Sequence, residues 1–296
     1  MLLPPDPTEI VTKDMHTTQR GFERAPIVDH DDHTAPSVFT PENLLREARR
    51  QKGIPHGSVP SICVLDPDGD LVDDLRAQGW AQQDTTWACY HTELSTFAHE
   101  GLDYGIVGRV VGAPFAVLVA EELFASGCQL LISITSAGQI ALIGAPPYFV
   151  LIERALRDEG TSYHYLPLAP YSELHPELGE MVRAGWDHTR LPLHIGASWT
   201  TDAPFRETES MLARCRSEGI LAVEMEAAAL YALASAKHKE IICFAHVTNQ
   251  MAQHGPDFEK GADQGSGAAL LLISETAQRW RRWRAEQDSR SKEPGG

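Results

Sequence analysis

The pattern of hydrophobic and polar positions divides the chain into a patterned body between two polar ends. Residues 1–37 are polar, contain several prolines and show no helix or strand periodicity, so we expect a flexible tail. Apolar runs recur over residues 38–286 without a break in composition, which predicts a single domain. Residues 287–296 are polar again, and we expect a second flexible tail.

The first part of the body predicts one helix and several strands. Thr40 stands at an N-cap position before Pro41, and apolar residues follow at helical spacing, which predicts a helix over residues 40–50. Residues 61–65 predict a short buried strand, which a turn at 66–70 connects to a helix ending near Gln78. Residues 87–111 predict two or three further strands.

A strand, a crossover helix and a second strand follow one another in the middle of the chain. Residues 112–127 predict an apolar helix, residues 129–134 a strand and residues 135–138 a loop of small residues. Further strands are predicted at 193–198, 220–225 and 240–248, and a last helix at 262–285. This order predicts an α/β fold with a mixed sheet, whose ligands bind in loops such as 135–138 at the strand ends.

Charge and composition narrow the classes of partner. The 296 residues carry a net charge of −16, which argues against nucleic acid or an anionic membrane as a partner. A signal-peptide pattern and an apolar run of transmembrane length are both missing, so we expect a cytoplasmic protein. The five cysteines are scattered and indicate buried free thiols.

The acidic tail contains the stretch Asp29-His-Asp-Asp-His33, whose side chains are of metal-ligating type. In a flexible acidic segment we interpret it as solvated tail, and we expect no metal site.

Two glutamates interrupt the most apolar part of the chain, at the junction of the 220–225 strand with an Ala- and Leu-rich helix. Burying the carboxylates of Glu224 and Glu226 is costly unless hydrogen bonds compensate. Glu226 lies in the first turn of the predicted helix, where the macrodipole helps to keep it ionised. An ionised carboxylate only accepts hydrogen bonds and therefore suits the two hydroxyls of a sugar diol. Met225 suits the apolar face of a sugar ring.

Several segments together resemble the nucleoside phosphorylase/uridine phosphorylase superfamily over about residues 60–280. The strongest resemblance is between Val223-Glu-Met-Glu-Ala-Ala-Ala-Leu-Tyr231 and the ribose-binding signature of that family. The other segments follow in the family order, at Gly112-Ala-Pro-Phe-Ala, Thr135-Ser-Ala-Gly138, Thr200-Thr-Asp-Ala-Pro-Phe and Val247-Thr-Asn-Gln250.

The resemblance implies one α/β domain around a mixed, barrel-like central sheet flanked by helices, assembled as a homo-oligomer, either a dimer or a hexamer. It implies cleavage of a nucleoside by phosphate to give free base and ribose 1-phosphate, as in nucleoside salvage. Nucleoside and phosphate are then the small-molecule partners, and no metal or organic cofactor is expected.

The resemblance also implies roles for individual residues. Glu226 would hold the ribose 2′- and 3′-hydroxyls, and Asn249 would hydrogen-bond the base as it gathers negative charge in the transition state. Ser136 and the amides around Gly138 would hold the anionic nucleophile. The remaining expected substrate-binding residues are Met225 on the ribose, Phe205 stacked on the base, Arg206 on the base side, and Glu224.

The chain departs from the family where phosphate should bind. Pro67 and Leu71 stand at the places of a family glycine and arginine, and Ser133 at the place of a second arginine. Two charge-assisted contacts to phosphate are therefore missing. Arg109 and Arg206 are the candidate replacements, and Arg109 joins Ser136 as a phosphate candidate.

These departures leave three functional readings open. A nucleoside phosphorylase stands first, a nucleosidase that uses water second, and a non-catalytic relative that binds a nucleoside third. The nucleosidases place an aspartate at the position of Asn249, where it acts as general acid. An asparagine at this position resembles the uridine and 6-oxopurine phosphorylases instead. The base itself, and completion of the pocket by His33 or Arg46 of a neighbouring subunit, stay open.

Overall fold

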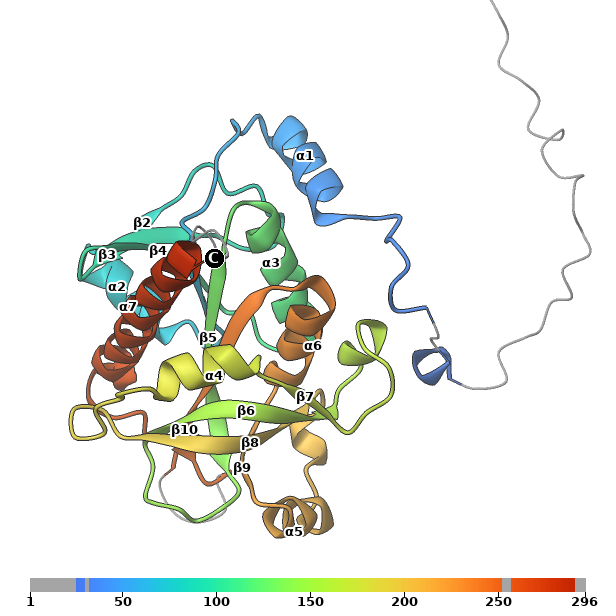
Figure 1. The fold of residues 1–296 in the computed structure, drawn as a ribbon, viewed down its shortest axis with the longest axis vertical. Coiled ribbons are helices and arrows are strands. Elements are labelled where there is room, and N and C mark those ends of the chain that lie inside the picture. Colours follow the sequence, from blue (N-terminus) through green and yellow to red (C-terminus); the bar gives the residue numbers. More distant parts are fainter. Residues whose placement is uncertain (1–24, 30–31, 252–256, 291–296) are drawn as a thin grey trace, which may run out of the picture.

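The computed structural model describes residues 25–29, 32–251 and 257–290, and Figure 1 shows their arrangement. Five strands close on themselves to form a barrel-like sheet, in the order β5, β10, β6, β8 and β9, with β9 returning to β5. Their bounds are β5 (Leu130–Gln139), β6 (Tyr148–Asp158), β8 (Leu193–Thr201), β9 (Ile220–Glu224) and β10 (Glu240–Asn249). The expected mixed, barrel-like sheet is confirmed.

A second run of strands extends the sheet from the barrel. β1 is parallel to both β5 and β4, and the hairpin partners β3 and β2 follow at the far edge. Their bounds are β1 (Ile62–Asp66), β2 (Gln82–Gln83), β3 (Ser95–His99) and β4 (Leu102–Gly108). The short β7 (Tyr171–Glu173) lies outside this strand order and pairs antiparallel with β6 beyond the residues that pair with β10.

Helices surround this sheet (Figure 1). α3 packs against α6 and α1, while α7 contacts α4 and α2. The helices are α1 (Pro41–Lys52), α2 (Asp70–Ala77), α3 (Ala113–Ala125), α4 (Pro176–Arg183), α5 (Glu209–Ser217), α6 (Ala227–Lys237) and α7 (Ser266–Arg290). Short 3₁₀ turns are η1 (Pro26–Val28), η2 (Ser162–His164), η3 (Pro204–Arg206) and η4 (Ala262–Gly265). None of the described helices combines the length and the apolar content needed to cross a bilayer.

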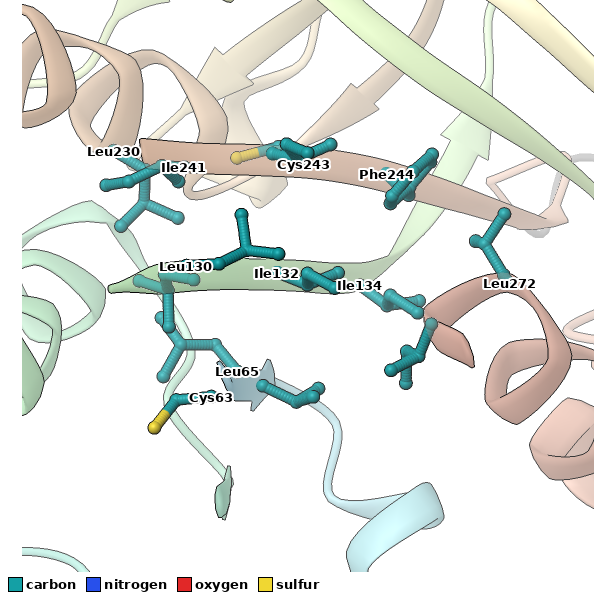
Figure 2. Packing of buried hydrophobic residues seen from close by; sticks show 14 of the residues in the cluster. Cys63, Leu65, Leu130, Ile132, Ile134, Leu230, Ile241, Cys243, Phe244 and Leu272 are labelled. Carbon is teal, nitrogen blue, oxygen red and sulfur yellow. The ribbon is translucent and has the colours of Figure 1, made fainter. Parts of the chain in front are cut away.

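The core lies on both faces of the central strands. In Figure 2, apolar side chains from β1, β5, β10, α6 and α7 meet in one cluster. Ile132 of β5 and Phe244 of β10 are fully buried, and each such side chain contributes about 1.5–3 kcal/mol of hydrophobic stabilisation. Central parallel strands are covered on both faces, which explains their nearly continuous apolar runs. All five cysteines are buried and free, as expected.

Local signals determine the first helix. The Thr40 side chain accepts a hydrogen bond from the Asn43 amide at 3.3 Å, Pro41 is the first helical residue, and Gly53 ends the helix with φ of +66°. The predicted N-cap is thereby confirmed.

Several sequence expectations differ from the structure. Residues 135–138, expected to form a loop, belong to β5, because β10 pairs with the backbone of Thr135, Ser136 and Ala137. Strands β6 and β7 and helices α4 and α5 had not been predicted. The last helix starts at Ser266 and runs to Arg290, past the expected end at residue 285 and into the segment 287–296 that had been expected to form a flexible tail.

Candidate functional site

A gap between neighbouring strands opens the sheet beside β5. On one edge of β5, the pairing with β1 ends at Ser133, and the pairing with β9 begins at Gly138. Among the described residues no strand pairs with this edge between those points, while β10 covers the opposite edge throughout. We call residues 134–137 on this side the free edge of β5. Ligands in open α/β sheets bind where neighbouring strands diverge in this way.

The junction between β9 and α6 places Glu226 at the free edge. Glu226 is the N-cap residue of α6, and its residue is only 1% exposed. Its Oε2 accepts a hydrogen bond from Thr135 Oγ1 at 2.8 Å, and its Oε1 accepts one from the Gly112 amide at 2.6 Å. Gly112 has φ of +91°, a conformation that favours glycine, and it begins α3. Three separate elements therefore meet at this carboxyl group.

Glu224 is held by the protein itself. Its Oε1 accepts hydrogen bonds from Ser198 Oγ at 2.9 Å and Thr200 Oγ1 at 2.5 Å. Its Oε2 accepts the amides of Glu226 at 2.8 Å and Ala227 at 2.7 Å. These bonds satisfy amides at the start of α6 and join β8, β9 and α6.

The carboxyl groups of Glu224 and Glu226 lie close enough for a negative charge on one to disfavour ionisation of the other. Burial raises the pKa of Glu226, and the neighbouring charge of Glu224 raises it further. Hydrogen bonds from Gly112 and Thr135 oppose this rise without cancelling it. With four donors around it, Glu224 is the residue that ionises first. The expectation that the macrodipole keeps Glu226 ionised is therefore wrong, because burial and a like charge outweigh it.

Ser136 and Asn249 lie together where β5 and β10 end. Ser136 Oγ and Thr248 Oγ1 are 2.8 Å apart. The Asn249 Nδ2 donates to the Ala137 carbonyl at 3.3 Å, and its Oδ1 accepts from the Met251 amide at 2.9 Å. The β10 residue Asn249 is paired in register with Gly138, where an added Cβ would come within 3.0 Å of Met251 and Val223 side chains.

An acidic loop follows β1, beside Ser136. Asp66, Asp68 and Asp70 line a cavity of about 30 Å³ together with Ser136, His246 and Lys260. Lys260 Nζ forms ion pairs with Asp68, at 2.9 Å, and with Asp70. Burial raises the pKa of Asp66 to about 6, and burial lowers the pKa of His246 to about 4, which leaves its imidazole neutral near pH 7.

The structure gives Phe205, Arg206 and Arg109 surroundings other than the Glu226 carboxyl group. Phe205, in η3, is 100% exposed, and Arg206 beside it is exposed as well. Arg109 forms an ion pair with Asp73 of α2 and packs over Gly69. Met225 is half-buried between the two glutamates.

His33 and Arg46, the candidates for completing the pocket of a neighbouring subunit, contact residues of their own chain. His33 Nε2 is 3.2 Å from the Tyr163 carbonyl, and Arg46 donates to Asn43 Oδ1 at 2.8 Å. Of the acidic tail motif, His30 and Asp31 lie outside the described residues.

Sequence reasoning missed several residues of the site. Thr135 and Gly112 were inside motifs already singled out, but only the fold shows that they bind Glu226. His246 and Lys260 gave no sequence signal, because the pairing of β10 with β5 and the turn before α7 bring them to Ser136.

Comparison with known proteins gives a consistent result. The family described as the phosphorylase superfamily matches residues 61–277. Guanosine phosphorylase from Halorubrum lacusprofundi is 28% identical over 203 residues, covering 68% of this chain and 78% of that protein. Uridine phosphorylase from Thermococcus kodakarensis is 24% identical over 239 residues, covering 74% and 84% respectively. Uridine phosphorylase from Vibrio fischeri ES114 has a similar fold, with a TM-score of 0.60 at 18% identity over 74% of this chain and 92% of that one.

Proposed function

The chain belongs to the phosphorylase superfamily, and on that premise we propose that it cleaves the N-glycosidic bond of a nucleoside and releases the free base. The observation that carries this proposal is the buried Glu226 carboxyl group at the free edge of β5, with Thr135 and Gly112 fixing its two oxygens. Burying a carboxyl group next to a second one is costly, and titratable groups in such surroundings cluster at functional sites.

Glu226 is proposed to bind the ribose 2′- and 3′-hydroxyls. In this proposal the diol binds the ionised form of Glu226. Each carboxylate oxygen can accept two hydrogen bonds, and Thr135 and Gly112 use one on each. One acceptor position per oxygen is left for the two hydroxyls of the diol. Half-buried Met225 packs against the ribose ring in this proposal. The hydrogen bonds of Glu224 hold the junction of β9 with α6 in place.

The base is proposed to lie toward Asn249. In the transition state the sugar becomes an oxocarbenium ion and the base gathers negative charge, which a donor preorganised at the base stabilises. The Asn249 Nδ2 now donates to Ala137 at 3.3 Å and to Thr248 at 3.2 Å, and one of these bonds would be exchanged for the base. Phe205 and Arg206 are exposed and are proposed to contact the base from the side of η3.

Phosphate is the first candidate for the nucleophile, because the relatives are phosphorylases by name. Ser136 and the amides around Gly138 would hold it, with Arg109 as the nearby cation. Arg109 would first have to give up its ion pair with Asp73. Water is the second candidate, and the acidic loop of Asp66, Asp68 and Asp70 favours it. In that case the products are ribose and free base.

Assembly and location belong to the same proposal. We propose a homo-oligomer, a dimer or a hexamer, that acts in nucleoside salvage in the cytoplasm. Exposed apolar side chains on the described surface are compatible with contacts between copies, among them Val38, Phe39, Trp80 and Leu142. Light scattering of the purified protein measures the assembly.

One assay tests the proposed function. The protein is incubated with guanosine, inosine, adenosine and uridine, each with and without phosphate, and free base is measured. Base release in either buffer supports N-glycosidic cleavage. Binding of a nucleoside, seen as a thermal shift without any base release, would favour the non-catalytic relative and contradict the proposal.

A further inference from the structure

We infer that the nucleophile is a single water molecule held in the cavity between Asp66, Ser136, His246 and Ser266, with Asp66 as its general base. This inference rests on the proposed cleavage of a nucleoside and specifies its chemistry. It assigns a hydrolytic reaction to a chain whose relatives from Halorubrum lacusprofundi and Thermococcus kodakarensis are named phosphorylases.

The size of the cavity fits water. Its volume is about 30 Å³, and a water molecule needs about 10–15 Å³ of such space together with two to four polar partners. The cavity therefore has room for an ordered water molecule. The walls supply the required partners, because Asp66, Ser136, His246 and Ser266 all line the cavity.

One wall residue lacks the partner that a bound water would supply. Ser266, the first residue of α7, is 3% exposed, and its Oγ has no hydrogen-bond partner within the described part of the chain. Buried hydroxyls are almost always paired, with protein or with ordered water. The unsatisfied Ser266 hydroxyl is thus a second, independent indication of a ligand in this cavity.

The charges around the cavity select against phosphate. Lys260 is the cation on its wall, and it is already shared between Asp68 and Asp70. With Asp66 and Asp73 added, four carboxyl groups surround two cations, Lys260 and Arg109, so the surroundings are negative. An anionic nucleophile is repelled here, whereas a neutral water molecule is not.

Asp66 is suited to accept a proton. It is 6% exposed, and its Oδ2 accepts the Val72 amide at 3.0 Å, which fixes the carboxyl group. Its pKa of about 6 lies close to neutral pH, as a general base requires. The charged and titratable groups that surround it are Asp68, Asp70, Arg109, Lys260 and His246.

The free edge of β5 connects this cavity to Glu226. Neighbouring side chains on a strand point to opposite faces, so Thr135 faces Glu226 while Ser136 faces the cavity. No strand of the described chain covers β5 between these two faces on this side. A sugar lying across the free edge can therefore place its diol at Glu226 and turn its C1′ toward the cavity.

The proposed step is balanced. The water oxygen forms a bond to C1′ as the bond from C1′ to the base nitrogen breaks. The bonding electron pair leaves with the base, and the released water proton passes to the Asp66 carboxylate. The base is then protonated by solvent, and Asp66 returns its proton to solvent before the next turnover.

Isotope labelling tests the inference on the unmodified protein. The nucleoside that gives most base release is incubated in phosphate-free buffer made with H₂¹⁸O, and the sugar is analysed by mass spectrometry at the earliest times. Base release with ¹⁸O at C1′ is expected, above the label that free ribose acquires by exchange. Base release only after phosphate is added, with ribose 1-phosphate as product, would overturn the inference and leave nucleoside cleavage intact. Absence of base release in both buffers would count against the proposed function itself.

A variant tests the role of Asp66. Asp66→Asn keeps an oxygen acceptor for Val72 and removes the base, so phosphate-independent turnover should fall about 10²- to 10⁴-fold. Asp74→Asn is the matched control, because Asp74 lies on α2 outside the cavity and accepts from Gln78 at 2.9 Å. Its turnover should be unchanged. Equal activity of Asp66→Asn and the wild type would remove Asp66 from the reaction.

The pH profile gives a readout that does not depend on folding of a variant. Since the base must be ionised, wild-type kcat, measured with nucleoside saturating the Glu226 site, should decline as the pH falls through about 6. A profile without this decline down to about pH 5, in protein that remains folded, would contradict Asp66 as the base.

Discussion

Glu224 and Glu226 differ in what surrounds them, although a single residue separates them in the chain. Glu224 accepts four hydrogen bonds from side chains and from amides of α6. Glu226 accepts two and lies beside the charge of Glu224. One glutamate therefore stabilises the junction between β9 and α6, and the other stores unfavourable electrostatic energy at the free edge of β5.

Glu226→Gln should raise stability while it abolishes turnover. Because the pKa of Glu226 is raised in the folded protein, the native state binds a proton that the unfolded chain has released above about pH 4.5, so wild-type stability falls as pH rises. Glutamine does not ionise and escapes this loss. Thermal melts should show a higher Tm for the variant at about pH 8 and a smaller difference at about pH 5, at about 2–4 °C for each kcal/mol.

Glu224→Gln is the matched comparison. The NH₂ group of the glutamine would face N–H and O–H donors, because four donors converge on this side chain. The free energy of unfolding should therefore fall by about 1–3 kcal/mol. Equal Tm changes in the two variants would contradict the different roles assigned to the two glutamates.

Tyr231 joins α6 to the sheet through its hydroxyl group. The fully buried side chain donates to the Ile152 carbonyl at 2.5 Å and accepts the Cys243 amide at 3.1 Å. Tyr231→Phe should lower the free energy of unfolding by about 1–3 kcal/mol, measured by urea titration, because buried polar groups lose a partner. Tyr90→Phe, which removes an exposed hydroxyl bonded to Gln51, should change it by no more than about 0.5 kcal/mol. Equal losses in both variants would refute the argument.

At the residue scale, the sequence predicted the unusual burial of Glu224 and Glu226 but not their partners. An acidic residue amid Ala, Val and Leu is conspicuous in a sequence. The identities of Thr135 and Gly112 as partners depend on contacts across 91 and 114 positions of the chain, which no local pattern encodes. For the same reason, the ion pair between Arg109 and Asp73 could not be anticipated.

At the element scale, the turn that leads from η4 into α7 shapes the cavity. Gly265 has φ of +77°, and an added Cβ would lie 2.5 Å from His246 Cε1 and 2.7 Å from the Lys260 carbonyl. An alanine here is strained by its backbone and collides with two residues that line the cavity. The glycine is therefore required by the approach of this turn to β10.

Gly265→Ala should therefore reduce both stability and turnover. We expect a loss of about 1–3 kcal/mol in the free energy of unfolding, measured by urea titration. Gly267→Ala is the matched control, because that glycine lies inside α7 with open space around it, and alanine should stabilise the helix by about 0.5–1 kcal/mol. A neutral Gly265→Ala variant would show that the turn can relax without affecting the cavity.

The observed strands differ from the predicted ones mainly because pairing with neighbouring strands, more than local propensity, determines where a strand ends. The run Leu130-Leu-Ile-Ser-Ile134 was predicted as a strand from its apolar side chains. The continuation of this run to Gln139 consists mostly of small residues. It is a strand because the neighbouring strand β10 pairs with it. The free edge of β5 could not be predicted either, because it depends on where β1 and β9 stop pairing.

At the scale of the whole molecule, the fold class was predictable and the closure of the sheet was inferred only through family resemblance. The alternation of apolar strands and helices predicts an α/β fold on physical grounds. Closure requires β9 to return to β5 through Gly138 and Gln139, a long-range contact that is invisible in hydrophobic periodicity. The overlooked strand β6 completes the barrel between β10 and β8.

The central claim is that Glu226 at the free edge of β5 binds the hydroxyl pair of a nucleoside. Titration calorimetry of the wild type and Glu226→Gln with an uncleavable C-nucleoside and with its 2′,3′-dideoxy analogue tests it most directly. We expect the wild type to bind the nucleoside at least about tenfold more tightly than the analogue, a difference of about 1.4 kcal/mol, and the variant to lose most of that preference. Equal affinity of the wild type for both ligands, or an unchanged preference in the variant, would contradict the claim.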